Sequence, residues 1–493
     1  MKNFAKCLCL LTAAVLLFAM CSCRESAENP SSGGSSDGTN TDYKVTVNDK
    51  ISGTVRYAVR DKHSPEAEKV IADFMKQYPN IKVELVPFAE ESLDNYLATQ
   101  AAAGTMPDVV YGWDNLSYYA AQGWLYPLDK FIDADPEKAN YNKTSVDGFV
   151  LGGKTYALPA WLQFSTVVVN LDLIDALNLD RPEYDWTIED FVDLAKSATT
   201  DEYSGLNHVD QLDQYFMTVS MKNEAQWGYN PETRTYNLAG GEWEKAQATV
   251  NELLKYPGLV ADALRNSELA NKGQMDDYAK KFGMNADGLA DGKILIAAQS
   301  TWDNIWLKNL TFDWDFYPVP GSKDAGYKEL VHADYGIMLS TAKDPEACYE
   351  FLKYITVGKD GLISRMTYRK DYFASSDVGD VVMPEPYFII PANGDSYVGE
   401  FFKELSFVPE GIKYMYDKLD KSVKGDYSKV LPDYNTVVND VLYQASQKAR
   451  EGQSVAALAK ETETKINTGL SNSFKIFDEK MKKVQEDFDK RAG

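Results

Sequence analysis

The amino-terminal part of the chain alternates between strand-like and helix-like patterns. Residues 53–59 read as a strand, and apolar and polar residues alternate in residues 81–86, as they do in half-buried strands. Residues 64–78 and residues 93–103 instead repeat their apolar positions at helical spacing. A short apolar run at 108–111 comes next. We therefore predict a β-α-β-α-β order, which is typical of a parallel sheet covered by helices.

Two later segments carry helix signals. Thr187 and Asp190 have the spacing of a capping box, in which each side chain bonds to the backbone of the other residue at the start of a helix. Residues 345–355 place Cys348 on the apolar face of a second predicted helix. We therefore predict that Cys348 is a small buried residue of the core.

The first residues resemble a bacterial lipoprotein signal. Two lysines precede an apolar run over residues 8–19, which is too short to span a bilayer comfortably. Cys21 and Cys23 follow at once. We predict a signal peptide over residues 1–22 and a lipid anchor on Cys23, because Met20 is a bulky residue for cleavage before Cys21. An ordinary secretory signal is the alternative.

Residues 23–49 are predicted to form the lipidated cysteine and a flexible tether. They are rich in Ser, Gly, Asn and Asp and hold too few apolar residues to bury a core. Residues 50–493 have ordinary apolar content and are too many for one hydrophobic core, so they predict two domains. No segment after the signal is apolar enough to cross a membrane.

Composition excludes several classes of function. The chain has 74 Asp and Glu against 51 Lys and Arg, so nucleic acid and anionic membrane surfaces are poor partners. Cys348 is the one cysteine in the body of the protein, which rules out an intrachain disulfide framework. With three histidines and no HExxH, GxSxG or mature CxxC motif, we predict no metal site, no cofactor and no enzyme that depends on histidine or zinc.

Residues 148–155 match the spacing of a phosphate-binding P-loop. That motif needs a helix that begins at Lys154, so that backbone amides meet the phosphate. Pro159 would interrupt such a helix early. We predict a β-hairpin with a Gly152-Gly153 turn instead, and regard the P-loop match as accidental.

Six segments together resemble the family 1 extracellular solute-binding proteins, which include the maltose-binding proteins. Each motif alone is weak, but their order and spacing agree with the family along nearly the whole mature chain; they are residues 103–110, 121–125, 153–159, 167–170, 291–302 and 334–340. The resemblance implies an α/β fold with two lobes, each a mostly parallel sheet flanked by helices, joined by crossing hinge strands.

The resemblance also implies lobe boundaries and a function. The amino-terminal lobe would comprise residues 50–163 and 335–395, and the carboxy-terminal lobe residues 164–334 and 396–493. A monomer of this kind, anchored on the extracytoplasmic side of the membrane, captures a carbohydrate in the cleft between the lobes and delivers it to the permease of an ABC importer. Closure of the lobes would be a hinge motion.

A sugar site needs flat aromatic rings for the pyranose face and planar amides or carboxylates for adjacent hydroxyls. In the first lobe, Asp61 and Lys62 follow the first strand, and Trp113 and Asp114 follow the strand at 109–111. Ligands of open α/β sheets bind beyond the carboxyl ends of the strands, so these four residues are candidate contacts. Each could instead be a packing residue or part of a solvated turn.

Further candidates lie at the crossover and in the second lobe. Gln163 stands where the maltose-binding relatives carry a carboxylate, and this departure changes the expected hydroxyl preference. The resemblance and the strand-end rule together give the other candidates, which are Trp161, Tyr215, Trp302 and Asp303, with Trp227 and Tyr434 added for aromatic character.

Two other functions compete with import. An extracellular glycoside hydrolase would need a pair of carboxylates across the sugar, and this acidic chain offers many. A surface glycan-binding protein without a transporter is the second alternative. A permease gene beside this one would favour import over either.

Overall fold

The computed structural model describes residues 50–61, 64–89, 92–141, 146–222, 228–301, 307, 310–374, 390–391, 408–423 and 427–492. The predicted signal peptide, the tether, the anchor at Cys23 and four candidate contacts lie outside the described residues; these four are Lys62, Trp227, Trp302 and Asp303.

The first lobe is built on three parallel strands. β1 (Gly53–Arg60) lies between β2 (Ile81–Phe88) and β3 (Val109–Gly112). α1 (Ser64–Gln77) and α2 (Leu93–Ala103) connect these strands in the predicted β-α-β-α-β order. The parallel pairing puts the carboxyl ends of β1 and β3 at the same edge of the sheet.

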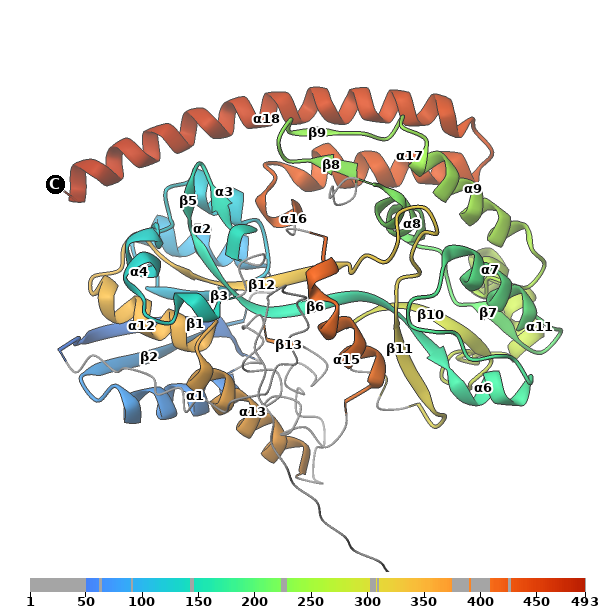
Figure 1. The fold of residues 1–493 in the computed structure, drawn as a ribbon, viewed down its shortest axis with the longest axis horizontal. Helices are drawn as coiled ribbons and strands as arrows, with labels where there is room; N and C mark the ends of the chain where they lie inside the picture. The colour runs from blue at the N-terminus through green and yellow to red at the C-terminus, as the bar shows by residue number, and fades with distance from the viewer. Residues whose placement is uncertain are drawn as a thin grey trace, which may run out of the picture. The chain divides into compact units, whose positions relative to one another are not determined.

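One long strand, β6 (Ala157–Asn170), passes from the first lobe into the second (Figure 1). Up to Phe164 it pairs with β12 (Val331–Met338), which in turn pairs with β3. From Ser165 onward it pairs with β10 (Ile294–Ser300), and β11 (Trp314–Pro318) flanks it as well. The pairing partner of β6 changes between Phe164 and Ser165, so β6 joins the two lobes at this point.

The second lobe adds β7 (Ser204–Leu206), which runs parallel to β10. In the main sheet, every antiparallel pairing of the described residues involves β6 or β12, including the short β13 (Ile390–Pro391). The remaining pairings are parallel. The predicted two-lobed α/β fold with mostly parallel sheets and crossing strands is therefore confirmed.

Residues 148–155 form the predicted hairpin. β4 (Val150–Leu151) pairs with β5 (Lys154–Thr155), and Gly152 and Gly153 both have positive φ, of 56° and 80°. A turn with two positive φ angles is the type that matches the twist of paired strands. Because a strand and not a helix contains Lys154, the rejection of the P-loop is confirmed.

The two predicted helix signals are also confirmed. Thr187 and Asp190 form a reciprocal capping box at the start of α7 (Ile188–Ser197). Cys348 is fully buried in α12 (Pro345–Ile355), and burial raises the pKa of its thiol well above the usual value.

The structure describes further regular elements. They are α3 (Leu116–Ala121), α4 (Asp129–Ala134), η2 (Lys138–Asn140), α6 (Leu171–Ala176), α8 (Leu212–Ser220), β8 (Tyr229–Asn230), β9 (Thr235–Tyr236), α9 (Glu242–Lys255), η4 (Asp262–Leu264), α10 (Ser267–Asn271), α11 (Asp277–Phe282), α13 (Lys359–Ala374), α15 (Glu410–Asp417), η8 (Leu419–Lys421), α16 (Tyr427–Val430), the π-helix η9 (Asn435–Asn439), α17 (Asp440–Arg450) and α18 (Val455–Ala492).

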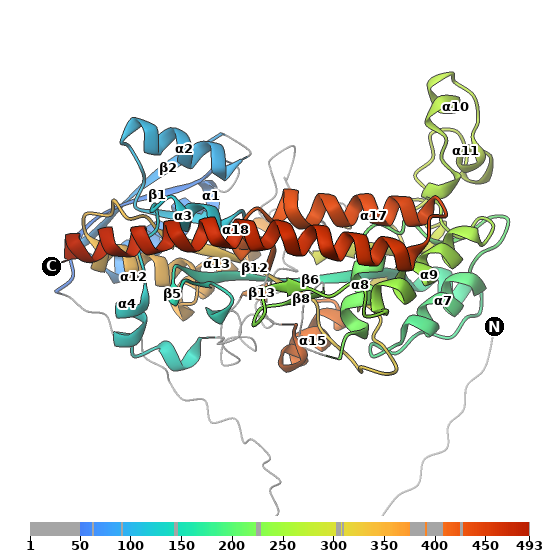
Figure 2. The same ribbon diagram turned by 90° about the horizontal axis from the view of Figure 1, so that it is seen from above.

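The last helix, α18, contacts both lobes. Its early residues Ile466 and Leu470 are buried in the second lobe's core, together with side chains of α9. Phe477 and Met481 are buried in the core of the first lobe, against side chains of α2 and α3. Figure 2 shows the helix running along both lobes beside α17. In the part of the chain that the structure describes, neither α18 nor any shorter helix has the length and apolar content needed to cross a membrane.

Candidate functional site

The strand register brings the carboxyl ends of both lobes' strands to the crossing region. Ser300, at the end of β10, pairs with Ser165, where β6 leaves the first lobe. Gly112, at the end of β3, pairs with Tyr335 of the crossing strand β12. In open α/β sheets the ligand sits beyond the carboxyl ends of the strands. The carboxyl ends of β3 and β10 therefore both lie beside the crossing strands β6 and β12.

Trp113 and Asp114 lie at the end of β3, as predicted. The guanidinium of Arg60, at the end of β1, stacks 3.6 Å from the centre of the Trp113 ring. Burial raises the pKa of Asp114, and the nearby carboxylate of Asp94 raises it further. Asp61 follows β1 and is exposed. The structure thus brings these three candidates to one edge of the first lobe.

Gln163 belongs to a polar cluster at the crossing. Its Nε2 donates to Oδ2 of Asp334 at 3.2 Å, and the Tyr111 hydroxyl donates to the same oxygen at 2.7 Å. The ammonium of Lys429 lies 3.0 Å from the other carboxylate oxygen. An amide donates to Asp334 where a carboxylate would repel it, which is a physical reason for glutamine at this position.

Trp161 is buried beside the same cluster. It is 6% exposed and packs with Ala160 and Tyr111, and the Arg365 guanidinium lies 4.8 Å from its ring centre. Tyr111 in turn approaches Trp113, with ring centres 6.2 Å apart. An aromatic row therefore connects the hinge with the first lobe's strand ends.

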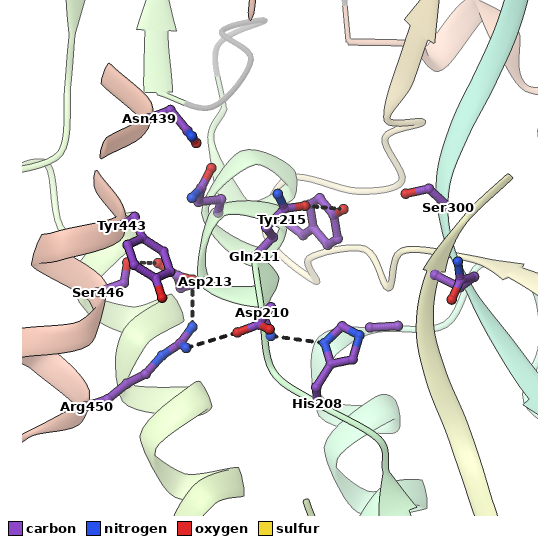
Figure 3. A pocket seen from close by; sticks show the side chains of 13 residues that line it. His208, Asp210, Gln211, Asp213, Tyr215, Ser300, Asn439, Tyr443, Ser446 and Arg450 are labelled. Carbon is purple, nitrogen blue, oxygen red and sulfur yellow. Dashed lines mark hydrogen bonds and ion pairs between the residues drawn. The ribbon is translucent and has the colours of Figure 1, made fainter. Parts of the chain in front are cut away.

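A pocket lies beyond the carboxyl ends of β7 and β10 in the second lobe (Figure 3). Its volume is about 430 Å³, within the size range of small-molecule sites. We call it the strand-end pocket; its lining includes His208, Asp210, Gln211, Asp213, Gln214, Tyr215, Gln299, Ser300, Asn439, Tyr443, Ser446 and Arg450.

Hydrogen bonds fix one wall of the strand-end pocket. Asp213 is 1% exposed and accepts from Ser446 Oγ at 2.6 Å and from Trp243 Nε1 at 3.1 Å. Arg450 bridges Asp213 and Asp210, with separations of 3.5 and 3.4 Å. These bonds tie α17 to α8 and fix the polar wall of the pocket.

Two tyrosines give the strand-end pocket aromatic surface. The Tyr215 hydroxyl donates to Oε1 of Gln211 at 3.0 Å, which fixes its ring in the wall. Tyr443 of α17 is 59% exposed, although it is large and partly apolar. In Figure 3 the two residues come from different helices of the same pocket.

A second pocket of about 430 Å³ lies between the first lobe and the carboxy-terminal segment. We call it the C-terminal pocket; its lining includes Asp94, Asn95, Asn115, Tyr118, Asp433, Tyr434, Asn435, Thr436, Ser473, Ile476 and Lys480. Tyr434, a candidate from the sequence, is part of this lining and is partly buried.

The structure separates the described candidates into four places. Asp61, Trp113 and Asp114 lie at the first lobe's edge, Trp161 and Gln163 lie at the crossing, and the last two lie in the pockets, Tyr215 in the strand-end pocket and Tyr434 in the C-terminal pocket. Their roles as ligand contacts stay predictions. Among the residues that the structure describes, no group of His, Cys, Asp and Glu side chains is arranged to hold a metal ion.

Sequence reasoning missed most of the strand-end pocket. His208 follows β7 just as Trp113 follows β3, so the same strand-end rule would have found it. Asn439, Tyr443 and Arg450 reach the pocket from η9 and α17, and no local sequence signal marks them.

Comparison with known proteins gives close agreement in family and fold. A family model for bacterial extracellular solute-binding proteins matches residues 60–357. A binding protein of Brucella abortus is 31% identical over 313 residues, which are 62% of this chain and 72% of that protein. A mannitol-binding protein of Pseudomonas aeruginosa is 27% identical over 224 residues, or 41% of this chain and 48% of that protein.

Solved structures support the fold. An ABC substrate-binding protein of Listeria monocytogenes, in complex with cycloalternan, superposes with a TM-score of 0.62 at 20% identity, covering 85% of this chain and 99% of that one. A sugar-binding protein of Xanthomonas citri gives 0.62 at 15% identity, covering 86% and 99%. Since the family model spans more than half of the sequence, this chain belongs to the bacterial extracellular solute-binding proteins.

Proposed function

We propose that this protein captures a carbohydrate between its lobes and delivers it to an ABC importer. The observation that carries the proposal is the lining of the strand-end pocket, where tyrosine rings stand beside planar amides and carboxylates. Tyrosine offers a flat face to the CH side of a sugar ring, and amides or carboxylates form paired hydrogen bonds with its hydroxyls. Similar proteins have been described as mannitol-binding, sugar-binding or bound to cycloalternan.

The proposed ligand contacts come from both lobes and the crossing. They are Asp61, Lys62, Trp113, Asp114, Trp161, Gln163, Tyr215, Trp227, Trp302, Asp303 and Tyr434. In the sequence, only Thr301 separates Trp302 and Asp303 from β10, whose last residues line the strand-end pocket, and this position supports their inclusion.

Capture would couple to a hinge motion. We place one lobe at residues 50–163 and 335–395 and the other at residues 164–334 and 396–493. Contacts that the ligand makes only in the closed state would shift the equilibrium between open and closed lobes towards closure. The closed monomer would dock on the permease subunits of the importer. The family is extracellular, and we propose that a lipid on Cys23 holds the protein on the outer side of the membrane after removal of residues 1–22.

Carbohydrate binding should raise the thermal unfolding midpoint of the mature protein, because a ligand that binds only the folded state stabilises it. We expect a shift of several degrees with at least one member of a panel of sugar alcohols, monosaccharides and linear oligosaccharides. Chromatography of the sugar after incubation should return it unchanged. A hydrolysed sugar would contradict capture, and a panel without any shift would contradict carbohydrate as the ligand class.

Trp113→Ala should reduce affinity for the sugar that binds by roughly tenfold, through loss of the stacking surface and of the Arg60 contact. Because Trp113 is only partly buried, the unfolding midpoint of the Trp113→Ala variant should fall by only a few degrees. Isothermal titration calorimetry checks this, with Trp302→Ala measured alongside. Unchanged affinity in both variants would contradict the proposed site.

A further inference from the structure

The Gln163 side chain has one buried polar atom without a partner. Gln163 is 4% exposed, and its Nε2 donates to Asp334 Oδ2 at 3.2 Å. Its other polar atom, Oε1, is buried and accepts no hydrogen bond from the residues that the structure describes. Buried acceptors are nearly always paired, because an unpaired one loses its bonds to water without compensation. We therefore expect a donor at Oε1 that the described chain does not supply.

The carboxylate of Asp334 determines which way this amide faces. Asp334 stands two positions after His332, the register partner of Gln163, so the two side chains lie diagonally on one face of the sheet. An amide has a donor at one end and an acceptor at the other, whereas an ionised carboxylate only accepts. Beside Asp334, the amide of Gln163 must turn Nε2 towards the carboxylate and Oε1 away from it.

Two further elements hold Asp334 in place. The Tyr111 hydroxyl of β3 donates to Oδ2 at 2.7 Å, and the Lys429 ammonium of α16 lies 3.0 Å from Oδ1. Lys429 also donates to the carbonyl of Ala333 at 2.6 Å, and its side chain is 9% exposed. Because β3, β6 and α16 all meet on this one carboxylate, its rotation is restricted, and so is that of the amide.

The sheet is irregular at the same position. Between Asp334 and Tyr335, the pairing of β12 with β6 skips Ala160. Such bulges redirect side chains and are frequent beside functional sites. After the bulge, the Tyr335 hydroxyl donates to the carbonyl of Asp114 at 2.6 Å. This point of β12 therefore reaches two proposed ligand contacts, Gln163 through Asp334 and Asp114 through Tyr335.

We propose that Asp334 is a positioning residue of the ligand site, which orients the Gln163 amide so that Oε1 accepts a hydrogen bond from the ligand. The ligand must then present an O–H donor at the crossing. Oε1 is enclosed by the protein, so the ligand reaches it through the opening of the lobes. The inference rests on the proposed function, and it adds a residue that acts through Gln163 without touching the ligand itself.

The test exchanges the two hydrogen-bonding groups. Asp334→Asn keeps the shape of the side chain but lets the amide of Gln163 face either way. Gln163→Glu places two carboxylates side by side. The double variant has one carboxylate and one amide again, with donor and acceptor exchanged, and it restores the charge balance with Lys429.

Isothermal titration calorimetry on the full mature protein measures affinity, and urea unfolding measures the free energy of unfolding. The probe is the tightest binder among D-mannitol, D-glucose, maltose and maltotriose. Asp73→Asn is the matched control, because Asp73 of α1 also accepts from lysines and a hydroxyl, through Lys69, Lys76 and Ser364.

Asp334→Asn should weaken binding of the probe by roughly tenfold in the parent, because Nε2 of Gln163 can then turn towards the ligand. In the Gln163→Glu background, the same substitution should strengthen binding, because it replaces a repelling carboxylate with a donor. The double variant should bind within about threefold of the parent. Asp73→Asn should leave the affinity unchanged.

A purely structural role for Asp334 predicts a different pattern. If Asp334→Asn lowers the free energy of unfolding but not the affinity, or changes the affinity in the same direction in both backgrounds, the positioning role is wrong while carbohydrate capture stands. If Asp334→Asn alone does not fold, the comparison of Gln163→Glu with the double variant still decides. If none of the four probes binds, both the inference and the proposed carbohydrate function are contradicted.

Discussion

Replacing Lys353 by methionine should lower the free energy of unfolding by about 3–5 kcal/mol at neutral pH. The side chain of Lys353 is 6% exposed, and its ammonium lies 3.6, 3.5 and 3.2 Å from carboxylate oxygens of Asp135, Glu137 and Glu350. Asp135 and Glu137 are themselves buried. Removing this ammonium would leave the three carboxylates without the cation that contacts them all, while the hydroxyl donors Tyr78, Tyr141 and Tyr349 would still bond to Asp135 and Glu350.

The loss should be smaller in mild acid. Burial raises the pKa of Glu137 above its usual 4.5, against the opposing charge of Lys353. A carboxyl group whose pKa is raised in the folded state takes up a proton more readily when folded, so its unfavourable effect fades as pH falls towards 4.5. In the Lys353→Met variant, the unfavourable effect of ionised Glu137 on the folded state should be larger, because the opposing charge is gone. The difference between variant and parent should therefore shrink as the pH drops from 7 towards 4.5.

Urea unfolding at pH 7 and at pH 5 measures both expectations. Lys76→Met is the matched control, because Lys76 pairs with Asp73 on the surface and its side chain is 76% exposed. An exposed ion pair of this kind contributes about 0–1 kcal/mol. Equal losses for Lys353→Met and Lys76→Met, or a loss for Lys353→Met that grows in acid, would contradict the account of the buried cluster.

Phe477→Ala should also cost about 3–5 kcal/mol of unfolding free energy. Phe477 is 5% exposed and packs in the first lobe's core, although it stands near the end of the chain on α18. Truncation to alanine removes buried apolar area and leaves a cavity between α18 and the first lobe. The change should weaken the attachment of the helix to this lobe.

The neighbouring Ile476→Ala is the control for Phe477→Ala, since Ile476 lies on the same helix and is 55% exposed. Its unfolding midpoint should stay within a few degrees of the parent. Denaturant unfolding measures the change in unfolding free energy for both variants. Similar losses of unfolding free energy at the two positions would contradict the idea that packing of α18 against the first lobe stabilises the protein.

The sequence was sufficient for elements whose signal is local. The period of the apolar residues predicted β1, α1 and β2, and the turn glycines Gly152 and Gly153 distinguished a hairpin from a phosphate loop. The sequence also placed Trp113 correctly at the carboxyl end of β3, whereas its role as a ligand contact stays a prediction. In each case neighbouring residues along the chain carry the information.

Other features depend on residues far apart in sequence, and no local pattern reports them. Asp213 and Arg450 meet across 237 positions, and Tyr443 reaches the strand-end pocket because hydrogen bonds hold α17 beside α8. The partner change of β6 between Phe164 and Ser165 leaves no trace in composition, because the whole strand is buried. Tertiary packing, not local preference, decides these features.

The reach of α18 into the first lobe has a consequence for the order of folding. One cluster of that lobe joins Ala58, near the start of the described chain, to Met481, near its end. Contacts across so long a stretch form slowly, because the intervening chain must be brought together first. Residues as far along the chain as Met481 must therefore be present before this core can close. Because α18 completes the core of the first lobe and also packs in the core of the second, we expect the first lobe to fold together with the second and not as an independent unit.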